Sequence, residues 1–235
     1  TVNINYRYFL ATILKNAQTN GTLTTATIDA TPGCSTGTGK ALTTTNTTIG
    51  KSFDFYCYTS ASNFDSQFQT AIGSASTNTL ILYPYQQGTI SPTISSTKTI
   101  PNNVNIVALI NGSLTVNANV SIPVANTNGS AVFILNNPPG NNGDLLVNSA
   151  VSQLDGFYIF PGIFNDNSDN MGSPNTALAG NGSLIGTGTI PWTLGRTVPA
   201  GTGPAEEWTY QPKYLTIFNN ILSTAKYTWQ ELPPQ

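Results

Sequence analysis

The sequence predicts a mainly β protein: a right-handed parallel β-helix, or β-solenoid, with a small α+β N-terminal cap and a helical C-terminal cap. Between residues 79 and 164, short apolar alternations are separated by Asn, Gly and Pro, which is typical of strands and turns. The string NGSLTVNANVS that begins at Asn111 recurs as NGDLLVNSAVS at Asn142, and shorter copies begin at Asn128 and Asn181. Asn and Gly tolerate positive φ, so each copy can mark a corner of a repeating coil.

Charge separates this fold from its main alternative, an antiparallel β-sandwich, in which Asn-Gly would mark hairpins. Only 8% of the residues are charged, against about 25% in an average soluble domain. The exposed face of a sandwich normally carries polar and charged side chains such as Lys and Glu, so their scarcity favours the coil. We expect an N-terminal cap over residues 1–78, a solenoid over 79–195 and a C-terminal cap over 196–235.

The N-terminal cap is expected to contain two helices with Thr-rich strands between them. An apolar face at helical spacing predicts the first helix, with Tyr6, Phe9, Leu10, Ile13, Leu14 and Ala17 on that face. A strand is the alternative there, because Thr and Tyr favour strands. The second helix is predicted over NFDSQFQTAIGSA, with Asn63 as its cap and Phe64, Phe68, Ala71 and Ile72 on one face.

The two cysteines of the chain, Cys34 and Cys57, lie in one Thr-rich stretch. An even pair in a composition typical of secreted proteins predicts one disulfide, which would stabilise the fold by about 3 kcal/mol. Two buried free thiols are the alternative. The chain contains no histidine, and two cysteines alone cannot complete a tetrahedral zinc site. We therefore expect no metal and no cofactor.

The C-terminal cap is expected to close one end of the coil with a helix. Pro212 suits the first position of a helix, and an apolar face follows at Leu215, Phe218, Ile221 and Leu222. A solenoid needs such a cap because its open end exposes unpaired strand edges.

Bulk properties predict an extracellular chain at the cell surface. The eight Lys and Arg residues form no basic stripe and the net charge is −2, so we expect no nucleic-acid partner. No run approaches the roughly 20 apolar residues of a membrane span. A start without Met predicts a processed form. Six sequons fit an exported protein without proving glycosylation, and they stand at Asn20, Asn46, Asn111, Asn119, Asn128 and Asn181.

The C-terminal part also resembles a known kind of protein. It combines an NGSLIG strand, WTLGR, GPAEEWTYQPKYL and WQELPP. These motifs resemble the end of uncharacterised exported, cell-surface β-solenoid proteins of bacteria, including candidate-phylum bacteria, over roughly residues 110–234. The matching positions are Leu184, Arg196, Pro204, Ala205, Glu206, Tyr210, Pro212, Trp229 and Glu231. The resemblance implies a surface location and an association with pili or other appendages, and it implies no known chemistry.

Arg196 is expected to form an ion pair with Glu206 or Glu231. In a chain with so few charges, a partly buried bond of this kind would fix how the C-terminal cap folds back. We expect this role to be structural and not one of ligand binding.

Catalysis is the least favoured interpretation of the sequence. A glycoside hydrolase needs two carboxylates facing one sugar, and the candidates are Asp144, Asp155, Asp166 and Asp169. A polysaccharide lyase usually adds Lys or Arg, and residues 101–195 contain neither. The absence of histidine excludes Ser-His-Asp and Cys-His arrangements. NDNSDNMG around Asp166 resembles a calcium loop only faintly, because the bidentate Glu is missing.

The sequence therefore predicts an extracellular structural protein that associates with copies of itself as the subunit of a filament or appendage. Low charge and the extended start TVNIN, free to pair with a neighbour's sheet edge, are the observations behind this prediction. A carbohydrate-binding adhesin is the first alternative and a polysaccharide-degrading enzyme is the second. The aromatic residues for either an interface or a glycan are Trp192, Trp208, Tyr210, Tyr214 and Trp229.

Overall fold

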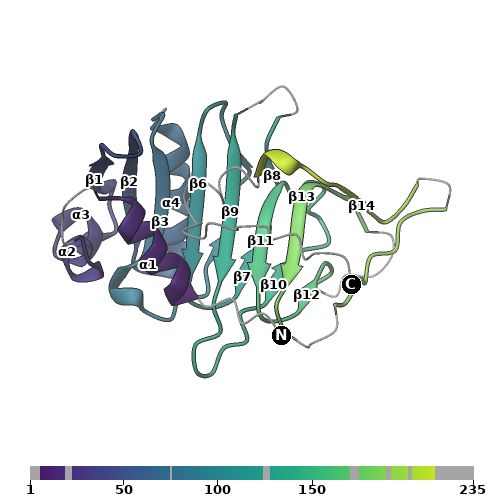
Figure 1. The fold of residues 1–235 in the computed structure, drawn as a ribbon. Coiled ribbons are helices and arrows are strands. Elements are labelled where there is room, and N and C mark those ends of the chain that lie inside the picture. The colour runs from purple at the N-terminus through teal and green to yellow at the C-terminus, as the bar shows by residue number, and fades with distance from the viewer. Residues whose placement is uncertain are drawn as a thin grey trace, which may run out of the picture.

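The computed structural model describes residues 6–18, 23–74, 76–123, 128–169, 175–188, 192–200 and 203–214. Within these ranges the chain has a mixed α/β fold with one eight-stranded sheet, two smaller parallel sheets and four α-helices (Figure 1). The described part holds no helix that is long and apolar enough to cross a membrane.

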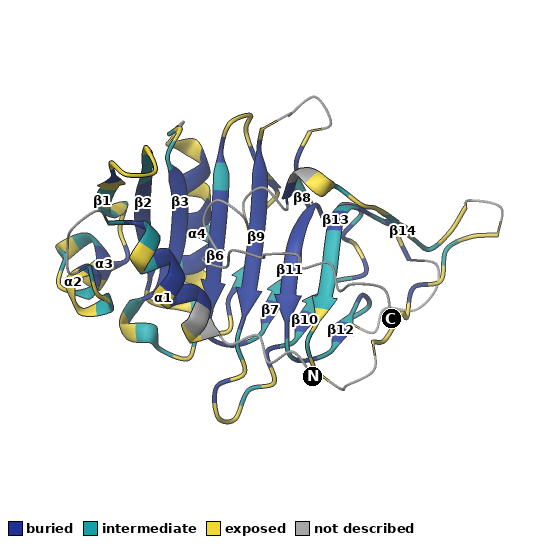
Figure 2. Cartoon of the chain, in the orientation of Figure 1, coloured by how far each residue is buried: buried dark blue, intermediate teal, exposed yellow. Residues whose placement is uncertain are grey.

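The large sheet has the strand order β1-β2-β3-β6-β9-β11-β13-β14. Its strands are β1 (Lys40–Asn46), β2 (Lys51–Tyr58), β3 (Thr79–Pro84), β6 (Asn105–Ile110), β9 (Ser130–Leu135), β11 (Gly156–Phe160), β13 (Leu178–Gly186) and β14 (Glu206–Thr209). Only β1 and β2 pair antiparallel, and the other pairs are parallel. The strands from β3 to β11 are continuous apolar runs and are buried almost throughout (Figure 2). This is the pattern of a parallel sheet covered on both faces.

Two smaller sheets are built from the segments between the long strands. One has the order β12-β10-β7-β4, with β4 (Thr93–Ile94), β7 (Leu114–Val116), β10 (Leu145–Val147) and β12 (Phe164–Asn165). The other pairs β5 (Lys98–Thr99) with β8 (Val120–Ser121). After each of the long strands β6, β9 and β11 the chain forms one or two short strands before it returns to the large sheet. Each passage of the chain therefore adds one strand to the large sheet and one or two short strands to the smaller sheets.

The repeated strings explain part of this arrangement. The copies that begin at Asn111 and Asn142 place Leu114 opposite Leu145 in the parallel pair of β7 and β10. The copy at Asn181 differs, because it lies inside β13 of the large sheet.

The predicted fold class, a mainly β protein built as a right-handed parallel β-helix or β-solenoid with two caps, is wrong. The antiparallel β1–β2 pair makes the large sheet mixed, and four α-helices belong to the fold. The strands of the smaller sheets are only two or three residues long, so they do not form the continuous walls of a closed coil. The repeats indicated parallel pairing correctly, but they carried no information on strand length.

The helices are α1 (Tyr6–Asn16), α2 (Thr25–Asp29), α3 (Pro32–Thr36) and α4 (Ala61–Gly73). In the view of Figure 1, α1 lies in front of the large sheet and α4 behind it. The structure confirms the predicted helices at α1 and α4. The stretch GTLTTATIDATPG was predicted to form Thr-rich strands and turns, and this is wrong, because it contains α2 and the start of α3. The N-cap of α4 is Ser60, whose side chain accepts a hydrogen bond from the backbone N–H of Asn63, so the predicted cap at Asn63 is wrong.

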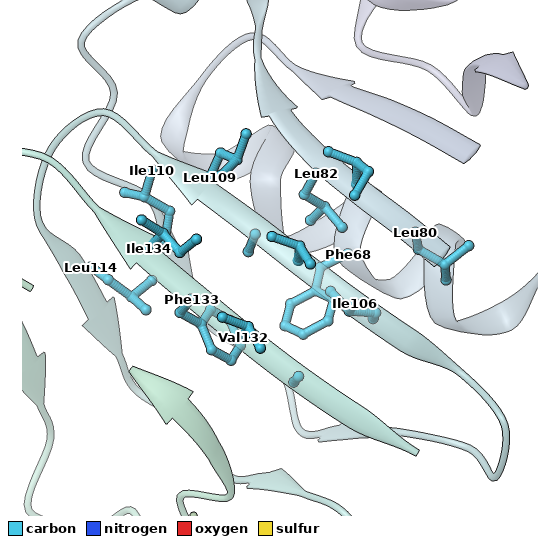
Figure 3. Packing of buried hydrophobic residues seen from close by; sticks show 14 of the residues in the cluster. Phe68, Leu80, Leu82, Ile106, Leu109, Ile110, Leu114, Val132, Phe133 and Ile134 are labelled. Atoms are coloured by element: carbon cyan, nitrogen blue, oxygen red, sulfur yellow. The ribbon is translucent and has the colours of Figure 1, made fainter. Parts of the chain in front are cut away.

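The core joins α4 to the sheets. Phe68 of α4 packs edge-on against Phe133 of β9 with 5.8 Å between ring centroids, and Phe133 stacks on Tyr158 of β11 at 4.6 Å. Leu and Ile side chains of β3 and β6 belong to the same buried cluster as Phe68 and Phe133 (Figure 3). The predicted disulfide between Cys34 and Cys57 is confirmed, and it ties α3 to β2.

The C-terminal cap can be compared only in part. Pro212–Tyr214 forms a single 3-10 turn, η2. The remainder of the predicted C-terminal helix, with Leu215, Phe218, Ile221 and Leu222, lies outside the described residues.

Candidate functional site

Among the described residues, a cavity lies beside β14, the last strand of the large sheet. Its volume is about 480 Å³, which is within the usual range of small-molecule sites. Six apolar or aromatic side chains line it, namely Phe164, Leu184, Trp192, Leu194, Trp208 and Tyr210, together with the polar residues Ser183 and Glu206. We call this cavity the aromatic pocket.

Trp208 is held in the pocket by a glycine on the neighbouring strand. Gly180 of β13 pairs with Trp208 of β14, and a Cβ on Gly180 would lie 2.3 Å from the indole ring. Only glycine therefore lets the ring lie against the β13 backbone.

Trp192 is held in a similar way from the other side. A Cβ on Gly186, at the end of β13, would lie 2.8 Å from the Trp192 indole nitrogen. The ring also contacts Phe160 and Phe164, with centroid distances of 5.9 and 5.8 Å. Even so, 45% of Trp192 remains exposed. The pocket thus presents a fixed aromatic ring to solvent.

The rim of the pocket is apolar and open. Leu194 is 61% exposed and Tyr210 is 57% exposed. Large apolar side chains that are exposed together and rim a cavity mark a binding surface more often than single exposed ones do. The arrangement fits a ligand or partner with a flat apolar face.

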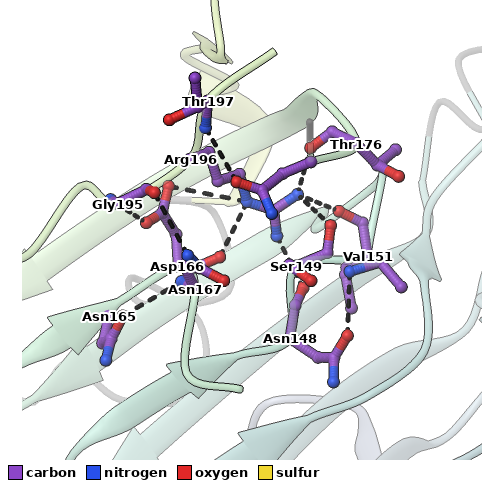
Figure 4. Close-up of polar contacts among 12 residues, drawn as sticks. Asn148, Ser149, Val151, Asn165, Asp166, Asn167, Thr176, Gly195, Arg196 and Thr197 are labelled. Carbon is purple, nitrogen blue, oxygen red and sulfur yellow. Dashed lines mark hydrogen bonds and ion pairs between the residues drawn. The ribbon is translucent and has the colours of Figure 1, made fainter. Parts of the chain in front are cut away.

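Arg196, two residues after the pocket residue Leu194, forms a dense buried network (Figure 4). Its guanidinium donates hydrogen bonds to the backbone carbonyls of Val151 at 2.6 Å, Thr176 at 2.7 Å and Asn148 at 2.8 Å. Its Nε donates to the Asp166 carbonyl at 2.8 Å and lies 3.6 Å from the Asp166 carboxylate. Burial lowers the pKa of Arg196, while the neighbouring carboxylates oppose that shift. Arg196 thereby joins its own segment to three others, residues 148–151, Asp166 and Thr176.

Glu206 connects this network to the pocket wall. Burial, together with a hydrogen bond to Asp166 and the charge of Asp166, raises the pKa of Glu206 to about 7, although Arg196 acts in the opposite direction. The Asp166 carboxylate also accepts a hydrogen bond from the Gly195 backbone N–H at 2.7 Å. A carboxyl group that changes charge near neutral pH therefore faces the cavity.

The structure brings some of the predicted site residues together. Trp192, Trp208 and Tyr210 line one pocket, whereas Tyr214 is fully buried and Trp229 lies outside the described residues. The ion pair of Arg196 is with Asp166, Glu206 lies in the same cluster, and the position of Glu231 is not described. The sequence did not indicate a place in the pocket for Phe164, Leu184 and Leu194, because no local pattern relates residues on separate strands.

The candidate catalytic carboxylates Asp144, Asp155 and Asp169 accept hydrogen bonds from backbone N–H groups. Asp144 accepts a hydrogen bond from the Ile163 N–H, and Asp155 accepts one from the Ile122 N–H. Asp169 accepts from the N–H and hydroxyl of Ser149; burial would raise the pKa of Asp169, but these bonds hold it below its usual value. In the described part of the chain no three Cys, Asp or Glu side chains gather to hold a metal ion.

The asparagine side chains of the described sequons also make hydrogen bonds within the fold. Side-chain amides donate hydrogen bonds from Asn46, Asn111, Asn119, Asn128 and Asn181, and Asn20 lies outside the described residues. A glycan on any of these nitrogens would have to replace the bond that the amide makes.

A second cavity, of about 430 Å³, is polar and is lined by Arg7 and by amide side chains. The Asn136 side chain donates to Asn111 at 2.7 Å, and Asn111 donates to the Gln87 carbonyl at 2.7 Å. This row ties together the loops that follow β3, β6 and β9. Because its amides already bind one another, the aromatic pocket is the stronger candidate site.

Comparisons with protein-family models, with curated proteins and with solved structures find no match for this chain. The resemblance of residues 110–234 to exported surface proteins therefore stays a prediction. By its fold and its site, the chain is a mixed α/β protein with a ligand-sized aromatic pocket beside the last strand of its large sheet.

Proposed function

We propose that this chain is an extracellular surface protein that acts by binding and not by catalysis, and that the aromatic pocket takes a neutral saccharide. The observation that carries the proposal is the pair of glycine-seated tryptophans around a cavity of about 480 Å³. The C–H face of a sugar ring is apolar and flat, so it stacks on a fixed indole, while its hydroxyls need only a few polar groups nearby. Ser183 and Glu206 offer such groups.

Other features support the surface location. The Cys34–Cys57 disulfide is compatible with an oxidising, extracellular compartment. The low charge and the many Asn, Ser and Thr residues agree with this setting.

A binding role without catalysis is supported by the way the carboxylates are used. Asp144 and Asp155 hold backbone N–H groups of neighbouring segments. Asp166 is fully buried beneath Arg196, where a substrate would not reach it.

The test is a glycan array followed by calorimetry on each sugar that binds. We expect Trp192→Ala and Trp208→Ala each to weaken binding by about fivefold to thirtyfold, because stacking on an aromatic ring contributes on the order of 1–2 kcal/mol. Ile49→Ala is the matched control, because Ile49 is 43% exposed but does not line the pocket. Failure of every neutral glycan to bind, or unchanged binding by both Trp variants, would refute the proposal.

A second candidate function is that of a structural subunit that assembles with copies of itself into a filament or appendage. The observation that favours it is β1, a seven-residue strand at the open end of the large sheet with Lys40 as its one charged residue. Among the described strands, only β2 pairs with β1. An edge strand with so little charge is suited to pairing with another chain.

Light scattering and negative-stain microscopy at increasing concentration test this second candidate. Thr45→Lys places a charge on the exposed edge and should suppress assembly, whereas Thr48→Lys in the adjacent turn should not. A wild-type protein that stays monomeric at high concentration would exclude the subunit role.

A further inference from the structure

We infer that Asp166 and Glu206 share a single proton, and that the aromatic pocket binds its ligand only while Glu206 carries this proton. The inference rests on the proposed function, because it names the ligand class of the same pocket: uncharged saccharides and not anionic ones. It also adds a control by pH that the proposed function does not require.

The geometry requires a proton between the two carboxyl groups. The Asp166 Oδ2 and Glu206 Oε1 atoms are both buried, and neither receives a hydrogen bond from an N–H or hydroxyl donor within the described residues. The interaction with Asp166 raises the pKa of Glu206, so the two carboxyl groups act on each other directly. Two ionised carboxylates in contact repel, whereas one proton turns the contact into a charge-assisted O–H···O⁻ bond.

The local balance of charge leads to the same conclusion. Arg196 is the cation of this cluster, and Asp166, Asp169 and Glu206 all act on it. Most of its donors bind backbone carbonyls. One guanidinium does not neutralise three carboxylates. Asp169 is exposed and its bonds from Ser149 lower its pKa, and Asp166 is fully buried against Arg196, so Glu206 is the carboxyl that takes up a proton.

Among the described residues, no other acidic or basic side chain is close enough to take the place of the proton on Glu206. The charged groups that act on Glu206 are Asp166 and Arg196, and β13, the strand that pairs with β14, has no ionisable side chain. Glu207 follows Glu206 along β14, so its side chain points to the opposite face of the strand. Tyr210 is the other ionisable side chain in the pocket.

The charge state of Glu206 acts directly on the aromatic pocket, because Glu206 is part of its wall. Glu206 and Trp208 are alternate residues of β14, so their side chains lie on one face of the strand, and both line the cavity. Ionisation of Glu206 places a second negative charge in an apolar wall and against Asp166. The wall then repels an anionic ligand, and the contact that positions β14 beside the Arg196 network becomes repulsive.

The first experiment needs no ligand. Carbon-13 NMR of carboxyl-labelled protein should show one Glu carboxyl that titrates near pH 7, as the raised pKa of Glu206 requires, and this signal should be missing in Glu206→Gln. Glu207→Gln is the matched control and should leave the signal in place. If no Glu carboxyl of the wild type titrates between pH 6 and 8, the shared proton is disproved without recourse to any variant.

The second experiment follows the affinity for a neutral saccharide found on the array. If only the protonated form binds, affinity should fall by about tenfold from pH 6 to pH 8, and the matching uronic acid should bind more weakly at both values. Glu206→Gln should remove the pH dependence. Binding that is equal at pH 6 and pH 8 overturns the inference but leaves the proposed function standing. If Glu206 titrates near pH 7 but the protein binds no saccharide, the shared proton is supported and the proposed saccharide-binding function is refuted.

Discussion

Gly182 shows how a single residue constrains the fold. It pairs in register with Gly156 across β13 and β11. A Cβ on Gly182 would lie 1.8 Å from the Gly156 carbonyl oxygen, and the φ of Gly182 is +149°. The sequence marked Asn181-Gly182 as a corner because glycine permits positive φ. The residue type was informative, but the reason is close contact between two strands.

The variant Gly182→Ala should therefore destabilise the protein by about 2–3 kcal/mol, because it adds backbone strain to overpacking. Urea denaturation followed by circular dichroism measures this loss. Gly73→Ala is the matched control: Gly73 lies in α4 with nothing within 4 Å of the new Cβ, so it should be neutral or slightly stabilising. Equal stability of the two variants would show that β11 and β13 do not approach as described.

At the scale of elements, α4 depends on a buried ion pair with β5. Lys98 has no exposed surface, and its Nζ lies 2.8 Å from the Asp65 carboxylate of α4 and 2.6 Å from the Ser96 hydroxyl. The ring of Phe68 lies beneath the ammonium group at 5.9 Å. Such a pair adds little over an apolar pair of the same size, but removal of one partner leaves an unpaired buried charge.

Asp65→Asn should accordingly cost about 3 kcal/mol of unfolding free energy. The pair formed by Lys40 and Asp54 provides a control. The Lys40 side chain is 47% exposed, so Lys40→Gln should cost less than about 1 kcal/mol. Both values come from denaturant titration at pH 7. A loss below 1 kcal/mol for Asp65→Asn would mean that Lys98 finds another partner.

A second tie between elements is the Cys34–Cys57 disulfide, which joins α3 to β2 over a separation of 23 residues. Closing a loop of this length stabilises the folded state by about 3 kcal/mol, so the double variant Cys34→Ser, Cys57→Ser should melt about 6–12 °C lower. Calorimetry with and without reductant measures the shift. An unchanged melting temperature would show that the α3–β2 contact is already fixed by packing.

The sequence predicted some elements well because their signals are local. The faces of α1 and α4 follow from helical spacing, and the pairing of β7 with β10 follows from repeated strings. The five-residue helices α2 and α3 escaped detection because such short segments carry too few apolar positions for a periodic signal.

At the scale of the whole molecule, local sequence patterns no longer predict which residues meet. The aromatic pocket combines Phe164 of β12, Leu184 of β13, Trp208 of β14 and the segment 192–194. The tryptophans stood out in the sequence, but their apolar neighbours did not, because the register of parallel strands decides which residues meet. The Arg196 partner was missed for the same reason: Asp166 is distant in sequence and brought close only by the fold.

Opposing shifts in carboxyl pKa predict a pH optimum of stability for the whole chain. Burial alone would raise the pKa of Asp65, but hydrogen bonds from Lys98, Ser96 and Ser95 hold it below its usual value. Stability from Asp65 is therefore present above about pH 4 and is lost as the pH falls through the depressed pKa. Glu206 has the opposite sign, because its pKa of about 7 exceeds the value in the unfolded chain.

Stability from protonated Glu206 is complete below about pH 4.5 and disappears as the pH rises through about 7. The melting temperature should thus peak between about pH 4 and 5 and fall by about 2–4 °C toward pH 8, the change that 1 kcal/mol produces in a chain of this size. Scanning calorimetry from pH 3 to pH 9 measures the profile. Glu206→Gln should make only the alkaline side of the profile shallower and Asp65→Asn only the acidic side, because each variant removes one of the titrations on that side. A wild-type profile that still rises between pH 5 and pH 8 would mean that the Asp166–Glu206 contact does not control stability in this range.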